Sequence, residues 1–449
     1  MSLAQISQIL DGTLRPVSAE ELTANRIAFD SRNITGGELF FALRGDRDGH
    51  DFILDAFRKG AVAAVVSDET SHEKPIIKVD DALVALGKLA REYRRSLQAK
   101  IVCITGSLGK TTCRRAIAQA LSATLKTSES KGNFNNLIGL PYSILNIEAT
   151  DEAAVLEVGI NIPGEMAKLG EIAAPDYAVF LNVAPVHLEG LRNLETIAEE
   201  KLTLLKYLQP EGLAFLNIDD DRIAKQRIVP STRIVTFGFD TGADYRITGT
   251  SLNDEGGTTV EVNGKAIKTS LHGRGAAYAV CSAFAVGTVF GLVADEIASA
   301  LDNFRGLSDR LNIMKLTGVT LISDVYNSSP MAVLSALETL SNVKCNRRIA
   351  VLGDMLELGD EEIVYHRNMI ADAVEMGIDK IFLFGNLCKS ALDSGSFAEN
   401  PNIAAFCDYS EMESSVMSSI ETGDAVLAKA SRAMRLERLV ESILKRYEN

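Results

Sequence analysis

A glycine-rich loop with the sequence TGSLGKTT at positions 105–112 carries the residue types that bind the phosphates of a nucleotide. The loop follows the apolar, β-branched run 101–104 and precedes a helix-like segment. Backbone N–H groups between a strand and a helix N-terminus can hold phosphate oxygens, while Lys110 offers a positive charge and the Thr111 hydroxyl can reach Mg²⁺. The usual spacing G-x-x-x-x-G-K-[ST] would require glycine in place of Ile104, so the loop is a variant. The pattern predicts nucleotide binding, and the alternative is a tight turn without a ligand.

Two further polar side chains follow apolar, strand-like segments. Glu157 closes the run 153–158, and His187 lies just beyond the run 177–183. Doubly wound sheets bind ligands at the C-terminal ends of their strands, and a carboxylate that ends a buried strand needs a partner. Because both segments would belong to the sheet that carries the phosphate loop, we expect these side chains to join Thr111 around a divalent cation. The alternative for His187 is a structural hydrogen bond within a loop.

Composition narrows the class of protein. The 449 residues allow about two to four domains, and 46% hydrophobic with 24% charged residues is typical of a soluble globular chain. A net charge of −14 argues against nucleic-acid binding, and the absence of any C-x-x-C pair among six cysteines favours reduced thiols. With no signal-peptide pattern and no apolar run near the ~20 residues of a membrane span, we expect a cytoplasmic protein. No segment marks a subunit interface, so we expect a monomer.

Runs of apolar residues divide the chain into three α/β blocks. Residues 1–98 are predicted to form a small α/β domain, and residues 312–449 a Rossmann-like α/β domain without a phosphate loop of its own. Between them, residues 99–311 alternate near-continuous apolar strands with helix-like segments, which predicts a doubly wound, mostly parallel sheet buried on both faces. Short alternating strands over 244–271 predict an antiparallel addition to it. Two facing α/β units form a cleft in which a nucleotide on one can meet a substrate on the other.

The expected strands lie at 26–30, 38–43 and 61–66, then at 101–105, 153–158, 177–183, 213–218 and 233–237, and finally at 319–325, 347–352, 380–384 and 424–428. The expected helices lie at 51–59, 82–97, 112–125, 275–291, 294–304, 330–341, 361–376 and 433–446. We find no internal repeat and no low-complexity stretch.

A series of motifs along the chain resembles the Mur ligase family. They are DSR at 30–32 with GDRDGHDF at 45–52, TGSLGKTT at 105–112, GNFNNLIGLP at 132–141, EVG at 157–159, HLEG at 187–190, DVYNSSP at 324–330 and GDMLELG at 353–359. The resemblance spans essentially the whole chain, with the motifs in the family's order. The first and the last of these motifs further point to the member that attaches D-Ala-D-Ala to UDP-N-acetylmuramoyl-tripeptide.

The resemblance implies an ATP-dependent amide ligase with ATP and Mg²⁺ as cofactors. ATP would phosphorylate the terminal carboxylate of the tripeptide, and the amine of D-Ala-D-Ala would displace phosphate to give the UDP-N-acetylmuramoyl-pentapeptide of peptidoglycan synthesis. Thr111, Glu157 and His187 match the family's magnesium ligands. Lys201 occupies the place of a carbamylated lysine, whose negative carbamate would bind a cation that an ammonium would repel. The alternative for Lys201 is a solvated lysine on an acidic helix.

The resemblance also implies roles for each block: UDP-substrate binding for 1–98, ATP binding for 99–311 and a ligase function for 312–449. Lys110, Lys201 and His187 would be catalytic. The residues expected to contact ATP are Gly106, Ser107, Leu108, Gly109, Lys110, Thr111, Thr112, Arg310, Asp324, Tyr326 and Asn327. The residues expected to contact the UDP-linked substrate are Ser31, Arg32, Gly49, His50, Asn135 and Asn136.

The chain departs from the family pattern at three places. The family's G-x-H-N-x-x-N stretch, whose asparagine helps to fix the base, reads GRGAAYA at 273–279, with Ala276 and Ala279 in place of both asparagines. Ser323 stands where the family often has a second acid, and KASR at 429–432 replaces K-G-S-R. These departures bear on nucleotide affinity and choice, and on the amine substrate, while the phosphate and metal groups are kept.

Two other functions fit part of the pattern. One is a related Mur-type ligase with a different acceptor or amine, or a folylpolyglutamate-type enzyme, although the latter lacks a domain like 1–98. The other is a nucleotide-binding switch without ligase activity, which would hydrolyse ATP slowly and without need of an amine.

Overall fold

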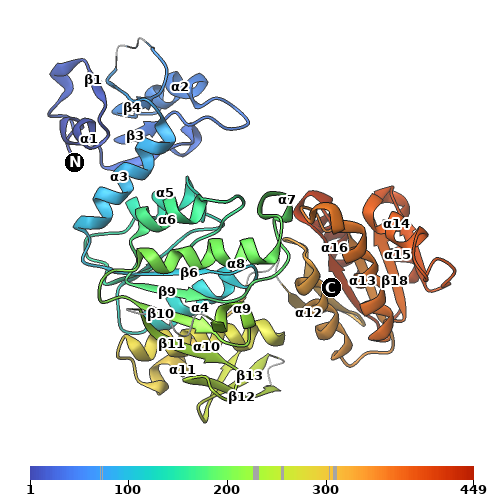
Figure 1. The fold of residues 1–449 in the computed structure, drawn as a ribbon. Helices are drawn as coiled ribbons and strands as arrows, with labels where there is room; N and C mark the ends of the chain where they lie inside the picture. Colours follow the sequence, from blue (N-terminus) through green and yellow to red (C-terminus); the bar gives the residue numbers. More distant parts are fainter. Residues whose placement is uncertain are drawn as a thin grey trace.

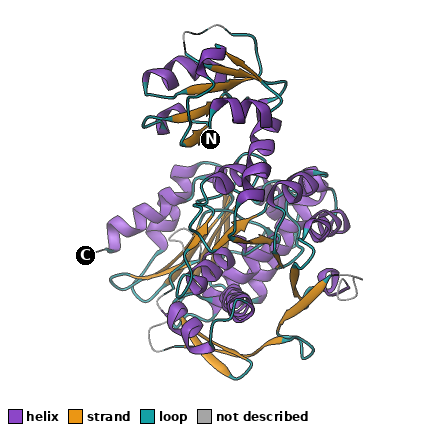
Figure 2. Ribbon diagram, turned by 90° about the vertical axis from the view of Figure 1, so that its left-hand side faces the viewer, coloured by secondary structure: helices purple, strands orange, loops and turns teal. Residues whose placement is uncertain are grey.

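The computed structural model describes residues 1–70, 72, 74–225, 232–253, 257–302, 304–306 and 311–448. It contains three sheets, of five, nine and six strands, and each is built from one contiguous part of the chain and flanked by helices (Figures 1 and 2). The predicted three-part α/β architecture with mostly parallel sheets is confirmed. No helix in these residues has the length and apolar character needed to cross a membrane.

The first sheet has the strand order β1-β5-β4-β3-β2 and is parallel except for β1. Its strands are β1 (Thr13–Arg15), β2 (Arg26–Ala28), β3 (Glu38–Phe41), β4 (Ala63–Val66) and β5 (Ile76–Lys78). Its helices are α1 (Leu3–Ile9), α2 (Ile53–Arg58) and α3 (Ala82–Ser96). Strands β1 and β5 were not predicted, because three residues are too few to show an alternating pattern. The expected helix 51–59 is in fact a 3-10 turn, Gly49–Phe52, followed by α2.

Helix α3 joins the first sheet to the second. Leu86 and Leu89 pack into the core of the first sheet, whereas Ala90 and Leu97 pack into a core of the second. Arg94, near its end, donates from Nη2 to Asp176 Oδ2 at 2.7 Å. The helix is therefore packed on both sheets, and the proposed boundary after residue 98 stays a prediction.

The central sheet has the order β14-β13-β12-β11-β10-β9-β6-β8-β7. Its strands are β6 (Lys100–Thr105), β7 (Thr127–Glu129), β8 (Ala153–Glu157), β9 (Tyr177–Phe180), β10 (Leu213–Asn217), β11 (Arg233–Gly238), β12 (Tyr245–Leu252), β13 (Thr258–Val262) and β14 (Lys265–Thr269). All pairings from β7 to β12 are parallel, and β12 to β14 form the predicted antiparallel addition.

Helices cover both faces of this sheet, as the apolar strands predicted. One core lies beneath α4 (Lys110–Leu121), α10 (Gly273–Val289) and α11 (Ala294–Asp302), and it contains Val102 and Ile104 of β6. The alternate residues Ile101 and Cys103 face a second core, which α5 (Gly139–Leu145), α6 (Glu165–Ala173) and α8 (Leu194–Leu202) cover. Two short helices, α7 (Leu188–Leu191) and α9 (Asp221–Ala224), follow strands β9 and β10.

The third sheet has the order β15-β16-β20-β17-β18-β19 and is parallel except for β15. Its strands are β15 (Asn312–Lys315), β16 (Thr320–Asp324), β17 (Arg348–Gly353), β18 (Lys380–Phe384), β19 (Ile403–Phe406) and β20 (Ala425–Lys429). Its helices are α12 (Pro330–Ser341), α13 (Glu362–Glu375), α14 (Asn386–Asp393), α15 (Tyr409–Ser419) and α16 (Glu437–Tyr447). The edge strands β15 and β19 and helices α14 and α15 were not predicted, because these segments are short and mix polar with apolar residues.

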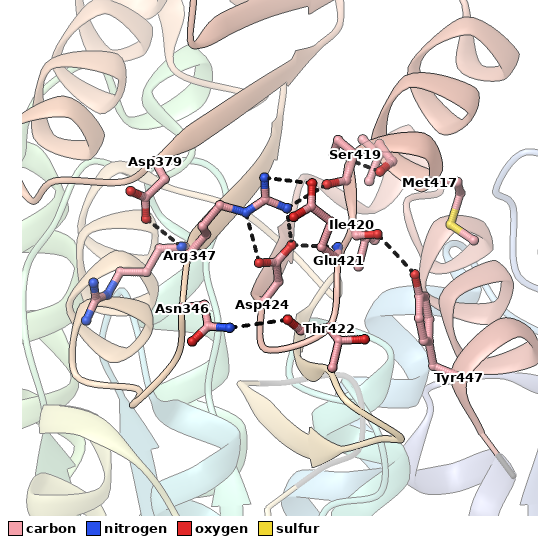
Figure 3. A network of polar contacts seen from close by, with 12 residues as sticks. Asn346, Arg347, Asp379, Met417, Ser419, Ile420, Glu421, Thr422, Asp424 and Tyr447 are labelled. Atoms are coloured by element: carbon pink, nitrogen blue, oxygen red, sulfur yellow. Dashed lines mark hydrogen bonds and ion pairs between the residues drawn. The ribbon is translucent and has the colours of Figure 1, made fainter.

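An ion pair between a buried carboxylate and a partly exposed arginine anchors the N-terminal ends of the two neighbouring strands β17 and β20 (Figure 3). The Asp424 carboxylate, 1% exposed, accepts hydrogen bonds from Arg347 Nε (3.0 Å) and Nη2 (2.7 Å) and from the Glu421 amide (2.8 Å). Arg347 Nη2 also donates to Ser419 O at 2.9 Å. The pair thus ties the end of α15 and the turn before β20 to the start of β17.

We expect Arg347→Ala to destabilise this sheet by about 3 kcal/mol, because it leaves a buried carboxylate without its cation. Hydrogen-exchange mass spectrometry should show faster exchange in 348–353 and 425–429 and no change in the first two sheets. Lys389→Ala, which removes an exposed pair with Asp393, is the matched control and should cost less than about 1 kcal/mol. Equal exchange in both variants would contradict the prediction.

Candidate active site

The phosphate loop is held in place by the chain segment that follows β9. The expected strand 177–183 ends at Phe180, and the next residues leave the sheet to bond to the loop. The Ser107 amide donates to Asn182 O (3.0 Å), the Leu108 amide donates to Asn182 Oδ1 (2.8 Å), and Asn182 Nδ2 donates back to Leu108 O (3.1 Å). Ser107 Oγ also donates to Ala184 O (3.0 Å) and accepts from the Ala184 amide (2.8 Å). The loop conformation is thereby fixed by side chains as well as by backbone.

Two glycines of the loop are required by its geometry. A Cβ at Gly106 would lie 2.8 Å from Leu181 Cβ, so a larger residue would push the loop away from the segment that holds it. Gly109 has φ +79°, a left-handed conformation, and is the N-cap of α4. Next to it, Lys110 Nζ donates to Gly106 O (2.8 Å) and Ser107 O (3.2 Å), so its charge lies over the loop. A helix follows the loop as predicted, but α4 begins at Lys110 rather than at the expected residue 112, and it ends at Leu121 rather than at 125.

Glu157 and Thr111 meet at the C-terminal edge of the sheet. Thr111 Oγ1 donates to Glu157 Oε2 at 2.8 Å, and Asn135 Nδ2 donates to Glu157 Oε1 at 2.9 Å. The Glu157 amide donates to Ser130 Oγ at 3.0 Å, which fixes the end of β8. The carboxyl group is only 3% exposed, and its two side-chain donors, Thr111 and Asn135, are both neutral. Hydroxyl and carboxylate oxygens side by side are ligands that suit Mg²⁺.

Lys201 and His187 lie close to this edge as well. Lys201, on α8, is 3% exposed, and burial together with the charge of Lys110 holds its pKa well below the ordinary value. Burial also lowers the pKa of His187, Glu357 opposes the shift, and the charges of Lys110 and Lys201 reinforce it. The proposed catalytic and metal-binding residues are therefore close enough to influence one another's charge. Their roles in catalysis and metal binding stay predictions.

The residues expected to hold the UDP end lie in two short turns of the first sheet's domain. Ser31 and Arg32 belong to the 3-10 turn Ser31–Asn33, where Arg32 pairs with Asp30 at 2.6 Å and is largely exposed. Gly49 is buried, and a Cβ there would lie 2.6 Å from Leu43 N. His50 accepts from the Ser67 amide at Nε2 (3.1 Å) and contacts Asp48 Oδ1 through Nδ1 (2.6 Å). Both ring nitrogens of His50 thus have partners within the domain.

An aromatic cluster links these turns to the central domain. Phe29, just before Asp30, makes edge-to-face contacts with Phe134 and Tyr142, with ring centroids 6.0 and 5.2 Å apart. Phe134 precedes Asn135, so the cluster places the first domain beside the Glu157 site. The Oδ1 of Asn136 accepts from the amides at 138 and 139, at the start of α5 (3.1 and 2.9 Å), and the expected contact of Asn136 with the substrate stays a prediction.

The third-domain residues expected at ATP are bonded within their own domain. Lys429, 1% exposed, donates to Asp324 Oδ2 (2.6 Å) and to Asn327 O (3.0 Å), and Arg432 lies over the Tyr326 ring at 5.3 Å. Arg310 lies outside the described residues.

The two alanines that replace the family's asparagines are buried in the first turns of α10. Beside them, Arg274 stacks over the ring of Phe239 at 5.0 Å and donates from Nε to Tyr278 Oη at 3.1 Å. Tyr278 Oη in turn donates to Asp219 Oδ2 at 2.9 Å. The Arg274 guanidinium and the rings of Phe239 and Tyr278 therefore lie at the start of α10. This is the region where the sequence predicted the loss of an asparagine contact to the base.

Sequence reasoning missed several residues that shape the site. Asn182 was hidden inside an expected strand, although a polar residue near the end of an apolar run is the same signal that identified Glu157. Ser130, which directly follows strand β7, accepts a hydrogen bond from the Glu157 amide, although the two residues are 27 positions apart in the sequence. Glu357, which contacts His187, lies 170 residues away in another domain.

Comparison with known protein families gives three matches that follow one another along the chain. The model of the Mur ligase middle domain matches residues 104–287, and that of the Mur ligase glutamate ligase domain matches 309–432. The model described as the catalytic domain of the Mur ligase family matches 23–94.

Individual relatives span nearly the whole chain. The UDP-N-acetylmuramoyl-tripeptide–D-alanyl-D-alanine ligase of Bacillus subtilis is 32% identical over 454 residues, which cover 99% of this chain and 98% of that protein. A crystal structure of MurF from Acinetobacter baumannii matches with a TM-score of 0.92 at 26% identity and covers 99% of this chain and 98% of its own. MurF from Thermotoga maritima in complex with ADP matches with a TM-score of 0.83 at 31% identity, over 94% of this chain and 98% of its own.

We expect Lys110→Ala to weaken binding of a non-hydrolysable ATP analogue by roughly 10- to 100-fold, since a hydrogen bond to a charged group contributes about 1.5–3 kcal/mol. Isothermal titration calorimetry measures the affinity, and circular dichroism checks that the fold is kept. Lys126→Ala, which removes an exposed lysine paired with Glu148, should leave the affinity unchanged. Unchanged affinity in Lys110→Ala would refute the assignment of the phosphate loop.

Proposed function

The chain belongs to the Mur ligase family, and we propose that it is the member that joins D-Ala-D-Ala to UDP-N-acetylmuramoyl-tripeptide, forming ADP and phosphate. The product is the UDP-N-acetylmuramoyl-pentapeptide of peptidoglycan synthesis. The observation that carries the proposal is the cluster at the C-terminal edge of the central sheet, where the phosphate loop meets Glu157 through Thr111 and lies beside the buried Lys201 and the half-buried His187.

The reaction needs negative charge to be stabilised at two successive steps. In the first, the terminal carboxylate of the tripeptide attacks the γ-phosphorus of ATP, an acyl phosphate forms and ADP leaves. In the second, the amine of D-Ala-D-Ala attacks the acyl carbon, and the tetrahedral species collapses with loss of phosphate and a proton. Lys110, whose Nζ lies over the loop, would hold the phosphate oxygens during both steps, and the loop that carries it is fixed before the substrates arrive.

The donor set at the edge of the sheet fits Mg²⁺. Thr111 Oγ1 and Glu157 Oε2 are within 2.8 Å of each other, and His187 offers an imidazole from the loop after β9. When bound there, the ion would neutralise charge on the phosphate oxygens that Lys110 does not reach.

Lys201 suits carbamylation better than it suits a permanent positive charge. Among the described residues, the charge that shifts its pKa is that of another cation, Lys110, so a buried ammonium is disfavoured. The neutral amine can add to CO₂: a bond forms between Nζ and the carbon, one proton is released, and a carbamate anion results. Such a carbamate would offset the charge of Lys110 and provide an oxygen ligand for a cation.

The other parts of the chain would bring the remaining substrate groups to this cluster. Ser31, Arg32, Gly49 and His50 would face the UDP end, and Asn135 the peptide. Asp324, Tyr326 and Asn327, with Arg310, would reach ATP after the third domain moves toward the phosphate loop. The domain limits 1–98, 99–311 and 312–449 belong to this proposal.

We also place the enzyme in the cytoplasm, as a monomer. All six cysteines are free, and Cys103, Cys113, Cys281 and Cys388 are buried where burial raises the pKa of each thiol. Buried thiols without disulfides are typical of a reducing compartment.

We expect phosphate release from ATP only when UDP-N-acetylmuramoyl-tripeptide and D-Ala-D-Ala are both present, with the pentapeptide identified by mass spectrometry. Release that ignores D-Ala-D-Ala but responds to another amine would instead assign a related Mur-type ligase, which the altered GRGAAYA stretch at 273–279 leaves as the second candidate. Slow hydrolysis that depends on neither substrate would favour a nucleotide-binding switch.

We expect a carbamate signal in the ¹³C NMR spectrum of the protein in ¹³C-bicarbonate, absent from Lys201→Met. The methionine side chain fills a similar volume, so the variant should fold, while its ligase activity should fall at least 100-fold because the cation loses a ligand. Lys206→Met, on the turn that follows α8, serves as the control and should keep the signal. A spectrum without the signal in the unmodified chain would overturn the carbamate assignment.

A further inference from the structure

Two residues with left-handed backbones contact each other between the central and third domains. His187, which precedes α7, has φ 52°, and Glu357, in the loop after β17, has φ 65°. Neither is a glycine, so each conformation is held by its surroundings. His187 Nδ1 contacts Glu357 Oε2, and the Leu188 amide donates to Glu357 O at 2.9 Å. In Figure 1, α7 lies between the central domain and the third domain.

The loop that carries Glu357 is fixed at both sides of the contact. The Leu356 amide donates to Ser431 Oγ at 3.0 Å, and Leu358 is buried in the core of the third domain. Gly359, with φ +64°, packs on Leu188, where its Cβ position lies 3.7 Å from Leu188 Cβ. Glu357 is thus presented to His187 by a rigid part of the third domain.

The contact determines which ring nitrogen of His187 carries the proton. A carboxylate can only accept, so Nδ1 must be the N–H donor and the lone pair of the neutral ring lies on Nε2. A histidine that binds a metal commonly donates its other ring N–H to a carboxylate, which sets the tautomer and the ring orientation. The charges of Lys110 and Lys201 lower the pKa of the ring, so both side chains lie within electrostatic range of it.

We propose that Glu357 is a positioning residue, through which the third domain holds His187 as the Nδ1–H tautomer and directs Nε2 to the cation of the active site. The inference rests on the proposed function, because it takes His187 as a ligand. The contact joins two of the matched Mur ligase domains, because His187 lies in the middle domain and Glu357 lies in the glutamate ligase domain. The third domain then affects the metal site before any of its residues touches ATP.

The test compares Glu357→Ala with Glu357→Gln and with Asp360→Asn. The glutamine keeps an oxygen that can accept from Nδ1–H, and Asp360 is an exposed carboxylate on the same loop. Long-range ¹H–¹⁵N NMR of histidine-labelled protein reports the tautomer, and His187→Gln identifies the signal among five histidines. Mn²⁺ electron paramagnetic resonance, with the β,γ-methylene analogue of ATP, measures the affinity for the cation.

We expect the unmodified chain, Glu357→Gln and Asp360→Asn to show the Nδ1–H tautomer. Glu357→Ala should shift toward Nε2–H and bind Mn²⁺ roughly 10- to 100-fold more weakly. The same tautomer and affinity in Glu357→Ala would overturn the inference and leave the proposed function intact. If the unmodified chain binds no Mn²⁺ with the analogue, the metal site of the proposed function fails, and the positioning role fails with it.

Discussion

The hydrogen bonds between the phosphate loop and residues 182–184 are the constraint on which the rest of the site depends. The Ser107 amide bonds to Asn182 O, the Asn182 side chain bonds to the Leu108 backbone, and the Ser107 hydroxyl bonds to Ala184. The loop and the segment after β9 therefore cannot move separately. That segment continues directly into His187, and the Val183 amide is tied in turn to Asp220 Oδ2 at 2.7 Å. One short stretch of chain therefore fixes the phosphate-binding groups and the imidazole in a single frame, at the edge where parallel strands end.

Burial gives this frame its electrostatic character. Glu157 is enclosed with neutral donors, whereas Lys201 is enclosed near another cation, and both arrangements are unfavourable for a protein that binds nothing. The chain's overall charge of −14 would repel an anionic substrate, so the local positive charge of Lys110 matters all the more.

Sequence alone predicted the parts of the site that have a local signal. The spacing of Gly106, Gly109 and Lys110 identified the loop, and a carboxylate at the end of an apolar run identified Glu157. Contacts that join distant segments carry no such signal, as with Glu357, which reaches His187 from another domain. The edge strands β1 and β7 also lack a local signal, because each is only three residues long. The role of Asn182 was missed for a different reason. Its apolar neighbours extended the predicted strand three residues beyond its true end at Phe180. The three-part fold was predictable because long apolar strands recur at regular spacing, whereas the aromatic contact of Phe29 with Phe134 was not.

The strand order of the third sheet has a consequence for synthesis on the ribosome. Strand β20 is the last to be made, yet it lies in the middle of the sheet, paired with β16 and β17. Until residues 425–429 emerge, these two apolar strands each have an open edge, of the kind that pairs with other chains. A nascent or prematurely terminated chain would therefore hold two complete N-terminal sheets and an unfinished third. Pairing of β20 with both neighbours is then the step that turns an aggregation-prone intermediate into a finished sheet.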